Sequence, residues 1–342
     1  MDVSLNVTSK CNLACVYCSS ASFYDGEVDE LTGDDMRRLA ARFDELGLFR
    51  LKLTGGEPLL RRDLFDLVEL FKPRRRGVGI NSNGTLIDGD AARRMRALGV
   101  RQCAVSLDGA DEATNAATRG RGALARTLSG VEALAAAGVP IAILCTVSRL
   151  NYRGLREVAR LGREYGAENV SFNTVNCQGK AAPRYSELML DAAQRLQVAQ
   201  ELLDLRANFY PRVSGDFLVF SFALTSPPPR WDGTLLPCGA AKETCVIGAD
   251  GWVFPCDKMP MLKCGNVKRE DIKAIWNAEP MRRVRALAGQ PVRLVADCAD
   301  CAHVSYCAGG CRGDAFLATG SLYGRDPLCY AHSPAVTERA RA

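Results

Sequence analysis

The chain has 342 residues, of which 47% are hydrophobic and 24% are charged, as is typical of a globular protein with a substantial core. This composition excludes a disordered, fibrous or coiled-coil chain. The net charge of +5 is mild, and the run Arg74-Arg75-Arg76 is typical of a solvated loop, so we predict no nucleic-acid partner.

The N-terminal residues Met1–Asn6 have neither the basic nor the apolar stretch of a signal peptide. The most apolar window, Val131–Val147, is interrupted by Gly138 and Pro140, so we predict no membrane span. We therefore expect a cytoplasmic protein. The chain has 15 cysteines, and in a reducing compartment thiols at short spacings are more often metal ligands than disulfides.

From residue 3 to about residue 210, short apolar runs alternate with stretches of helical period. The predicted strands are Val3–Val7, Phe49–Leu53, Val78–Asn81, Cys103–Leu107, Ile141–Val147 and Asn169–Thr174. The predicted helices are Asp34–Leu46, which follows a capping-box sequence at Thr32–Asp35, Leu64–Phe71, Ala91–Leu98, Leu124–Ala137 and Leu155–Tyr165. Repeated strand–helix units predict an α/β fold, a partial (β/α)6 TIM-like barrel with its chemistry at the carboxyl ends of the strands.

The pattern changes after a longer predicted helix, Ser186–Leu205. Pro227-Pro228-Pro229 marks a boundary, and the chain beyond it is rich in loops and cysteines. A hairpin is predicted from Cys245–Ile247 to Trp252–Phe254. We therefore predict a barrel at 1–210, a linker at 211–230 and a C-terminal domain at 231–342. That domain is too small for a large core, and metal ligation is the usual substitute.

Three cysteines follow the first predicted strand as Cys11-x3-Cys15-x2-Cys18. Three thiolates are one short of the four that close a structural zinc or iron–sulfur site, which leaves one metal position open to a ligand. Gly55-Gly56-Glu57-Pro58 follows the second predicted strand, where glycines let the backbone approach a ligand closely. Both segments should meet at the mouth of the barrel.

At these segments the sequence resembles the radical S-adenosylmethionine (radical SAM) superfamily. The resemblance spans the first two thirds of the chain. The motifs that carry it are Cys11-Asn12-Leu13-Ala14-Cys15-Val16-Tyr17-Cys18, Leu53-Thr54-Gly55-Gly56-Glu57-Pro58, Asn81-Ser82-Asn83-Gly84 and Val105-Ser106-Leu107-Asp108-Gly109. The resemblance implies that Cys11, Cys15 and Cys18 ligate a [4Fe–4S] cluster whose fourth iron binds SAM. Reductive cleavage of SAM then yields a 5′-deoxyadenosyl radical that abstracts a hydrogen atom from the substrate.

The resemblance also implies eight residues in contact with SAM. They are Tyr17 by the adenine, Gly55, Gly56 and Glu57 at the methionyl amino group, Asn83 in the third motif, Ser106 and Asp108 toward the ribose and carboxylate, and Arg119 on the carboxylate. Relatives often have a His-Asp pair shortly before this arginine, where the chain has Thr114-Asn115.

A second set of cysteines follows residue 230. Eight of them are ordered as Cys238, Cys245, Cys256, Cys298-x2-Cys301-x5-Cys307-x3-Cys311 and Cys329. Eight thiolates suffice for two four-ligand sites. Two zinc ions are the alternative, but zinc ribbons use paired Cys-x2-Cys knuckles and only Cys298/Cys301 forms one.

With Gly251 ahead of Cys256, this order resembles the SPASM domain, named for the peptide and sulfatase maturases that carry it. The resemblance implies two auxiliary [4Fe–4S] clusters, one on Cys238, Cys245, Cys256 and Cys311 and the other on Cys298, Cys301, Cys307 and Cys329. Full ligation of both favours electron transfer over substrate binding. The remaining cysteines, whose ordinary role is that of a small buried hydrophobe, are Cys103, Cys145, Cys177 and Cys264.

An oxidation of this kind benefits from a general base near the radical carbon. The only histidines, His303 and His332, lie in the C-terminal region, so a carboxylate is favoured. Asp257 directly follows Cys256, the position at which sulfatase-maturating relatives place a catalytic aspartate. The alternative is a loop carboxylate that bonds nearby backbone N–H groups.

The expected function is a radical SAM/SPASM oxidoreductase that dehydrogenates or cross-links a peptide or protein side chain, with a flavodoxin- or ferredoxin-type electron donor. The alternative substrate is a secondary alcohol of a small molecule, such as an aminocyclitol in antibiotic biosynthesis. A third hypothesis is a non-catalytic binding protein whose metal ions only stabilise the fold. Such a protein would not need a cluster with an open coordination position. Many peptide-modifying relatives carry a leader-binding domain, usually N-terminal, and the cluster motif here begins at residue 11. We therefore favour the peptide substrate only slightly.

Overall fold

The structure is a computed structural model, and it describes residues 2–24, 26–45, 50–72, 77–208, 212–217, 219 and 234–331. The Arg74–Arg76 run, the Pro227–Pro229 boundary and His332 lie outside these residues, as does the predicted linker except for residues 212–217 and 219.

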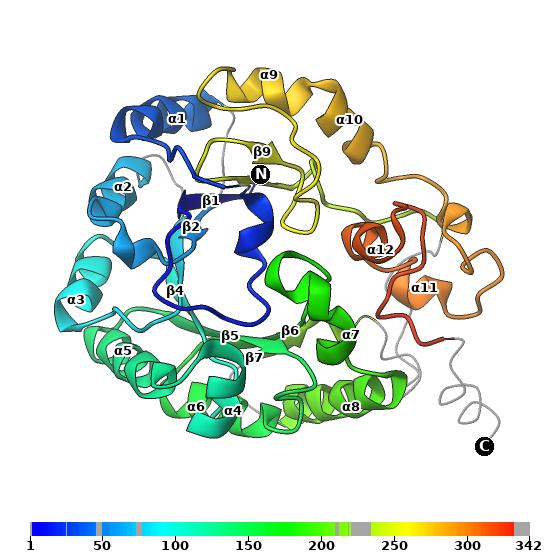
Figure 1. The fold of residues 1–342 in the computed structure, drawn as a ribbon, viewed down its shortest axis with the longest axis horizontal. Coiled ribbons are helices and arrows are strands. Elements are labelled where there is room, and N and C mark those ends of the chain that lie inside the picture. The colour runs from blue at the N-terminus through cyan, green and yellow to red at the C-terminus, as the bar shows by residue number, and fades with distance from the viewer. Residues whose placement is uncertain are drawn as a thin grey trace.

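A nine-stranded, curved sheet lies at the centre of the described part of the chain (Figure 1). Its strands are β1 (Asp2–Thr8), β2 (Arg50–Gly55), β3 (Gly77–Ser82), β4 (Gln102–Ser106), β5 (Ile141–Val147), β6 (Asn169–Thr174), β7 (Arg212–Gly215), β8 (Thr244–Ile247) and β9 (Val253–Phe254). They are ordered β7-β6-β5-β4-β3-β2-β1-β8-β9, and every neighbouring pair is parallel except β8 and β9. The α/β fold with a mostly parallel, partly closed barrel is confirmed.

The helices are α1 (Gly33–Glu45), α2 (Leu64–Phe71), α3 (Gly89–Ala97), α4 (Glu112–Arg119), α5 (Ala123–Ala137), α6 (Leu155–Glu164), α7 (Tyr185–Leu188), α8 (Ala192–Asn208), α9 (Ile272–Asn277), α10 (Glu279–Arg285), α11 (Val304–Cys307) and α12 (Arg312–Thr319). In Figure 1, α1, α2, α3, α5, α6 and α8 surround the sheet. Each strand–helix unit therefore brings its connecting loop to one rim of the barrel.

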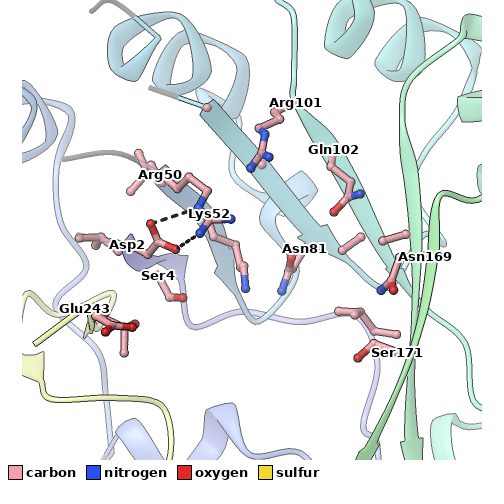
Figure 2. Close-up of a pocket in the computed structure, with 18 of the residues that line it drawn as sticks. Asp2, Ser4, Arg50, Lys52, Asn81, Arg101, Gln102, Asn169, Ser171 and Glu243 are labelled. Atoms are coloured by element: carbon pink, nitrogen blue, oxygen red, sulfur yellow. Dashed lines mark hydrogen bonds and ion pairs between the residues drawn. The ribbon is translucent and has the colours of Figure 1, made fainter. Parts of the chain in front are cut away.

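The strands alternate in burial because helices cover only their outer face. In β2, Leu51 and Leu53 are buried, whereas Arg50 and Lys52 are exposed. A parallel sheet covered on both faces would be apolar throughout. Here the inner face borders a cavity of about 480 Å³ at the amino ends of the strands, into which Lys52 and Asn81 point (Figure 2).

The sheet extends beyond the six expected strands. β7 lies inside the stretch assigned from the sequence to a linker, yet it pairs with β6, so the barrel continues past residue 210. The predicted hairpin is present as β8 and β9, and β8 pairs in parallel with β1, Cys245 opposite Val3. One core includes Val3 from the barrel and Ile275 from the C-terminal part. The C-terminal part is thus built onto the edge of the barrel sheet.

Local capping explains where the helices begin. The capping box at α1 is confirmed, since the Asp35 N–H donates to Thr32 Oγ1 and the Thr32 N–H to Asp35 Oδ2. The single helix predicted at Ser186–Leu205 is instead α7 and α8, because Asp191 and Gln194 form a second capping box that starts a new helix. Helix α4 was missed, although Asp111 caps it through the Thr114 N–H.

Candidate functional site

The loop with the first three cysteines leaves the carboxyl end of β1 and rests on the Gly-Gly-Glu segment that follows β2. The Gly56 N–H donates to Thr8 O at 2.8 Å, and the Glu57 N–H donates to Lys10 O at 2.7 Å. A Cβ atom at Gly56 would lie 2.0 Å from Lys10 O, and Gly55 has a φ of +132°. The two glycines therefore let the backbone of the cysteine loop pack directly on β2.

Glu57 is fully buried and connects the ends of β2 and β3. Its carboxylate accepts hydrogen bonds from Ser82 Oγ at 2.8 Å and from the Asn83 N–H at 2.7 Å. Burial raises the pKa of Glu57, while these hydrogen bonds oppose the increase. Glu57 thus positions the neighbouring loops, in addition to the contact with the methionyl amino group expected from the sequence.

Asn83 is held by Glu57 and reaches the cysteine loop. Its Nδ2 donates to Asn12 Oδ1 at 2.8 Å and lies 3.8 Å from Cys11 Sγ, within the range of an N–H···S hydrogen bond. Donors to a ligand sulfur stabilise its thiolate and tune an iron–sulfur centre. The contact therefore fits a cluster ligand at Cys11.

Tyr17, Asp108 and Arg119 form a buried group beside Cys15. Arg119 Nε lies 2.9 Å from Asp108 Oδ2, and the Tyr17 hydroxyl donates to the same oxygen. The other oxygen, Oδ1, accepts from the Thr146 N–H at 2.9 Å. Asp108 and Arg119 are therefore partners of each other, whereas the sequence assigned both of them to SAM.

This ion pair lies close to the cysteine loop. Burial raises the pKa of the Cys15 thiol to about 11; the Arg119 guanidinium opposes the increase, and the Asp108 carboxylate adds to it. The last turn of α4 also supports the loop, because Thr118 O accepts from the Val16 N–H at 3.0 Å. Ser106 is the last residue of β4 and is half-buried. Its hydroxyl has no hydrogen-bond partner among the described residues.

The segment after β6 covers the other side of the cysteine loop. Cys18 O accepts from the Lys180 N–H at 3.0 Å, and Gly179, with a φ of +55°, lets the two backbones meet. Tyr185 and two residues of the cysteine loop, Val16 and Tyr17, pack against the same small core of Val175, Ala181 and Leu188. Cys177 is half-buried in this segment.

Four C-terminal cysteines line one small cavity, as the second predicted quartet requires: Cys298, Cys301, Cys307 and Cys329. Burial, with smaller contributions from the charges of the other three cysteines, raises the pKa of the Cys307 thiol to about 12. Four thiolates in this cavity would repel one another, and positive metal ions would offset that repulsion.

The first predicted quartet is brought together only in part. Burial raises the pKa of Cys256 well above its ordinary value, and Asp257, Cys311 and Cys238 add to it. Cys245 instead lies in β8, fully buried in the main core. Burial raises its pKa to about 12, and the thiol that adds to this is Cys264. The structure therefore places Cys245 with Cys264, because strand pairing with β1 directs its side chain into the core.

A buried polar group joins the Cys256 segment to the barrel. Lys258 Nζ forms a hydrogen-bonded ion pair with Asp314 and lies 3.9 Å from Asp216 Oδ2. Asp216 follows β7 and accepts from the Thr174 N–H at 2.9 Å. Burial raises the pKa of Asp216 to about 6, against the opposing charge of Lys258. No motif in the sequence pointed to this group.

Asp257, the expected base, is exposed, and its carboxylate has no hydrogen bond or ion pair within the described residues. Of the unassigned cysteines, Cys103, Cys145 and Cys264 are buried. Among the side chains described here, no three from His, Cys, Asp or Glu converge to hold a single metal ion. No described helix is long and apolar enough to span a membrane.

Comparison with known proteins agrees with this arrangement. The profile of the radical SAM superfamily matches residues 5–162, and that of an iron–sulfur cluster-binding domain, SPASM, matches residues 238–302. The AdoMet-dependent heme synthase of Methanosarcina barkeri is 30% identical, with 96% of this chain and 95% of the relative covered. The mycofactocin maturase MftC of Mycobacterium ulcerans is 32% identical, with coverages of 94% and 86%.

The chain belongs to the radical SAM superfamily and has a C-terminal SPASM domain. Streptococcus suis SuiB bound to its precursor peptide SuiA has the same fold, with a TM-score of 0.75 at 18% identity over 96% of this chain and 75% of SuiB. This radical SAM enzyme therefore carries a SAM-binding [4Fe–4S] site and iron–sulfur ligation in its SPASM domain.

Proposed function

We propose that this radical SAM enzyme dehydrogenates or cross-links a side chain of a peptide or protein. The observation that carries the proposal is the three-thiol loop at the barrel mouth, with further thiol groups in the part of the chain that is built onto the barrel edge. The peptide bound to SuiB and the maturase activity in the name of MftC support this substrate class.

The chain would use its residues as follows. Cys11, Cys15 and Cys18 ligate the radical cluster, Asn83 donates to Cys11, and the Arg119 guanidinium opposes the increase that burial causes in the pKa of the Cys15 thiol. Bound SAM and three [4Fe–4S] clusters would supply the 5′-deoxyadenosyl radical and two electron carriers. Tyr17, Gly55, Gly56, Ser106 and Asp108 border the SAM position. The electron donor is a flavodoxin- or ferredoxin-type protein of the cytoplasm.

Asp257 is the proposed general base. Its exposed carboxylate lies beside Cys256, so a proton lost by the substrate would have an acceptor next to the electron-carrying site.

A second candidate substrate is a tetrapyrrole. The similarity to heme synthases along nearly the whole chain favours it over the aminocyclitol alcohol expected from the sequence.

The test is anaerobic turnover of the full-length, iron-loaded enzyme with SAM and a reductant. The substrates are any short peptide that the neighbouring genes encode and, separately, a porphyrin precursor of heme. We expect mass spectrometry to show loss of two hydrogen atoms from the peptide, together with 5′-deoxyadenosine. A modified tetrapyrrole with an unmodified peptide would establish the second candidate instead.

The base is tested by Asp257→Asn in the same assay. The variant should still form 5′-deoxyadenosine but lose most of its product, because hydrogen abstraction precedes proton loss. The matched control is Asp300→Asn, which changes an exposed carboxylate next to Cys301 and should keep full turnover. Full product formation by Asp257→Asn would remove Asp257 from the mechanism.

A further inference from the structure

Arg312 is the largest side chain that is fully buried, with 2% of its surface exposed, and it follows Cys311 at the start of α12. Its guanidinium donates only to backbone carbonyls: Gly324 O at 2.9 Å, Leu322 O at 3.2 Å, Gly310 O at 3.5 Å and Gly309 O. Gly309 and Gly310 have φ of +80° and +76°, a conformation that L side chains rarely adopt. The chain is therefore shaped locally to surround this cation.

Within the described residues, no carboxylate lies within ion-pair distance of Arg312. The nearby acids are engaged elsewhere, since Asp314 pairs with Lys258 and Asp326 accepts from the Cys311 N–H at 2.6 Å. A buried charge satisfied only by neutral dipoles is unfavourable unless an opposite charge lies close by.

Both predicted thiol groups adjoin this cation. Arg312 directly follows Cys311 in the chain, and it donates to Gly309 O, which belongs to a residue that lines the small cavity with Cys298. The positive charge of Arg312 lowers the pKa of Cys238, against the larger effect of burial, and it acts in the same way on Cys298. Cys238 belongs to the group with Cys256 and Cys311, and Cys298 belongs to the quartet that lines the small cavity. Arg312 is thus the buried cation that both groups share.

We propose that Arg312 is the common counter-charge of the two auxiliary iron–sulfur centres and that it raises the reduction potential of both. Thiolate-ligated clusters are negatively charged, and a reduced cluster is more negative than an oxidised one. A fixed cation next to both sites therefore stabilises the reduced state at each site and helps them to accept the electron that a substrate radical releases. The inference rests on the proposed two auxiliary centres, but not on the identity of the substrate.

The test is a redox titration of the full-length, iron-loaded enzyme without substrate, followed by electron paramagnetic resonance. Arg312→Gln removes the charge and keeps hydrogen-bonding ability, whereas Arg312→Lys keeps the charge and loses the guanidinium geometry. The control is Arg156→Gln, which removes an exposed cation paired with Asp204.

In Arg312→Gln we expect both auxiliary centres to become at least tenfold harder to reduce, about 59 mV for a one-electron couple, with the radical cluster unchanged. Arg312→Lys should retain most of the unmodified potential, and Arg156→Gln should change nothing. Unchanged auxiliary potentials in Arg312→Gln would overturn the proposal. Equal loss of iron in both Arg312 variants would also overturn it, because that result indicates a purely structural role. An iron count of about four in the unmodified enzyme would instead refute the proposed auxiliary centres.

Discussion

At the scale of single residues, the cysteines show how similar side chains acquire different roles. Cys245 and Cys256 lie in one short stretch of sequence and were assigned to the same cluster. In the structure Cys245 is a buried member of a strand, whereas Cys256 is half-buried and near Cys238 and Cys311. Local spacing alone does not distinguish them, because the direction of a strand side chain depends on the pairing register.

We therefore expect Cys245→Ala to keep the full iron content of the reconstituted enzyme. The variant should lose about 1 kcal/mol of stability, because one buried sulfur atom is removed from the core. Cys256→Ala is the matched variant, and it should lose about four irons per chain. Iron analysis and denaturant unfolding measure both effects.

If Cys245→Ala also loses about four irons per chain, as expected for Cys256→Ala, then Cys245 is a ligand of the auxiliary cluster.

At the scale of elements, each strand end at the barrel mouth supports its neighbour. The cysteine loop after β1 rests on Gly56 after β2, and Glu57 holds Asn83 after β3. Asn83 then reaches back to Cys11. The Gly-Gly-Glu segment was assigned from the sequence to SAM, and its contacts show that it also positions the cluster ligands.

Gly56→Ala should therefore disrupt the radical cluster selectively. The added Cβ would lie 2.0 Å from Lys10 O, so the loop must move away from β2. We expect the purified variant to lose about four irons and to form no 5′-deoxyadenosine, while the auxiliary signals remain.

The control is Gly154→Ala, whose Cβ would meet Asn151 O at an ordinary 3.7 Å. Normal iron content and SAM cleavage in Gly56→Ala would show that the loop does not depend on this contact.

At the scale of the whole molecule, the barrel and the C-terminal part share one sheet and one core. β8 pairs with β1, and Arg42 of α1 forms an ion pair of 3.0 Å with Asp271 beside α9. In addition, α8 contributes Leu196 to a small core with Cys307 of α11 (Figure 1). Contacts at both ends of the curved sheet couple the two parts.

This coupling predicts one cooperative unfolding transition. All three tryptophans follow residue 230, so their fluorescence reports on the C-terminal part, whereas most helices that circular dichroism detects surround the barrel. In anaerobic denaturant titrations of the iron-loaded enzyme, the two signals should have the same midpoint. Two separated midpoints would mean that the parts unfold independently.

The sequence by itself determined the family, the parallel sheet and the position of the cysteine loop after the first strand. These features depend on local spacing and periodicity, which each segment carries without its neighbours. Only the tertiary structure decided that Asp108 pairs with Arg119, that Cys245 enters the core and that Arg312 is buried next to both thiol groups. The direction of the Cys245 side chain depends on strand register, and the other two contacts depend on how a loop folds back onto a neighbouring helix, so no local pattern encodes them.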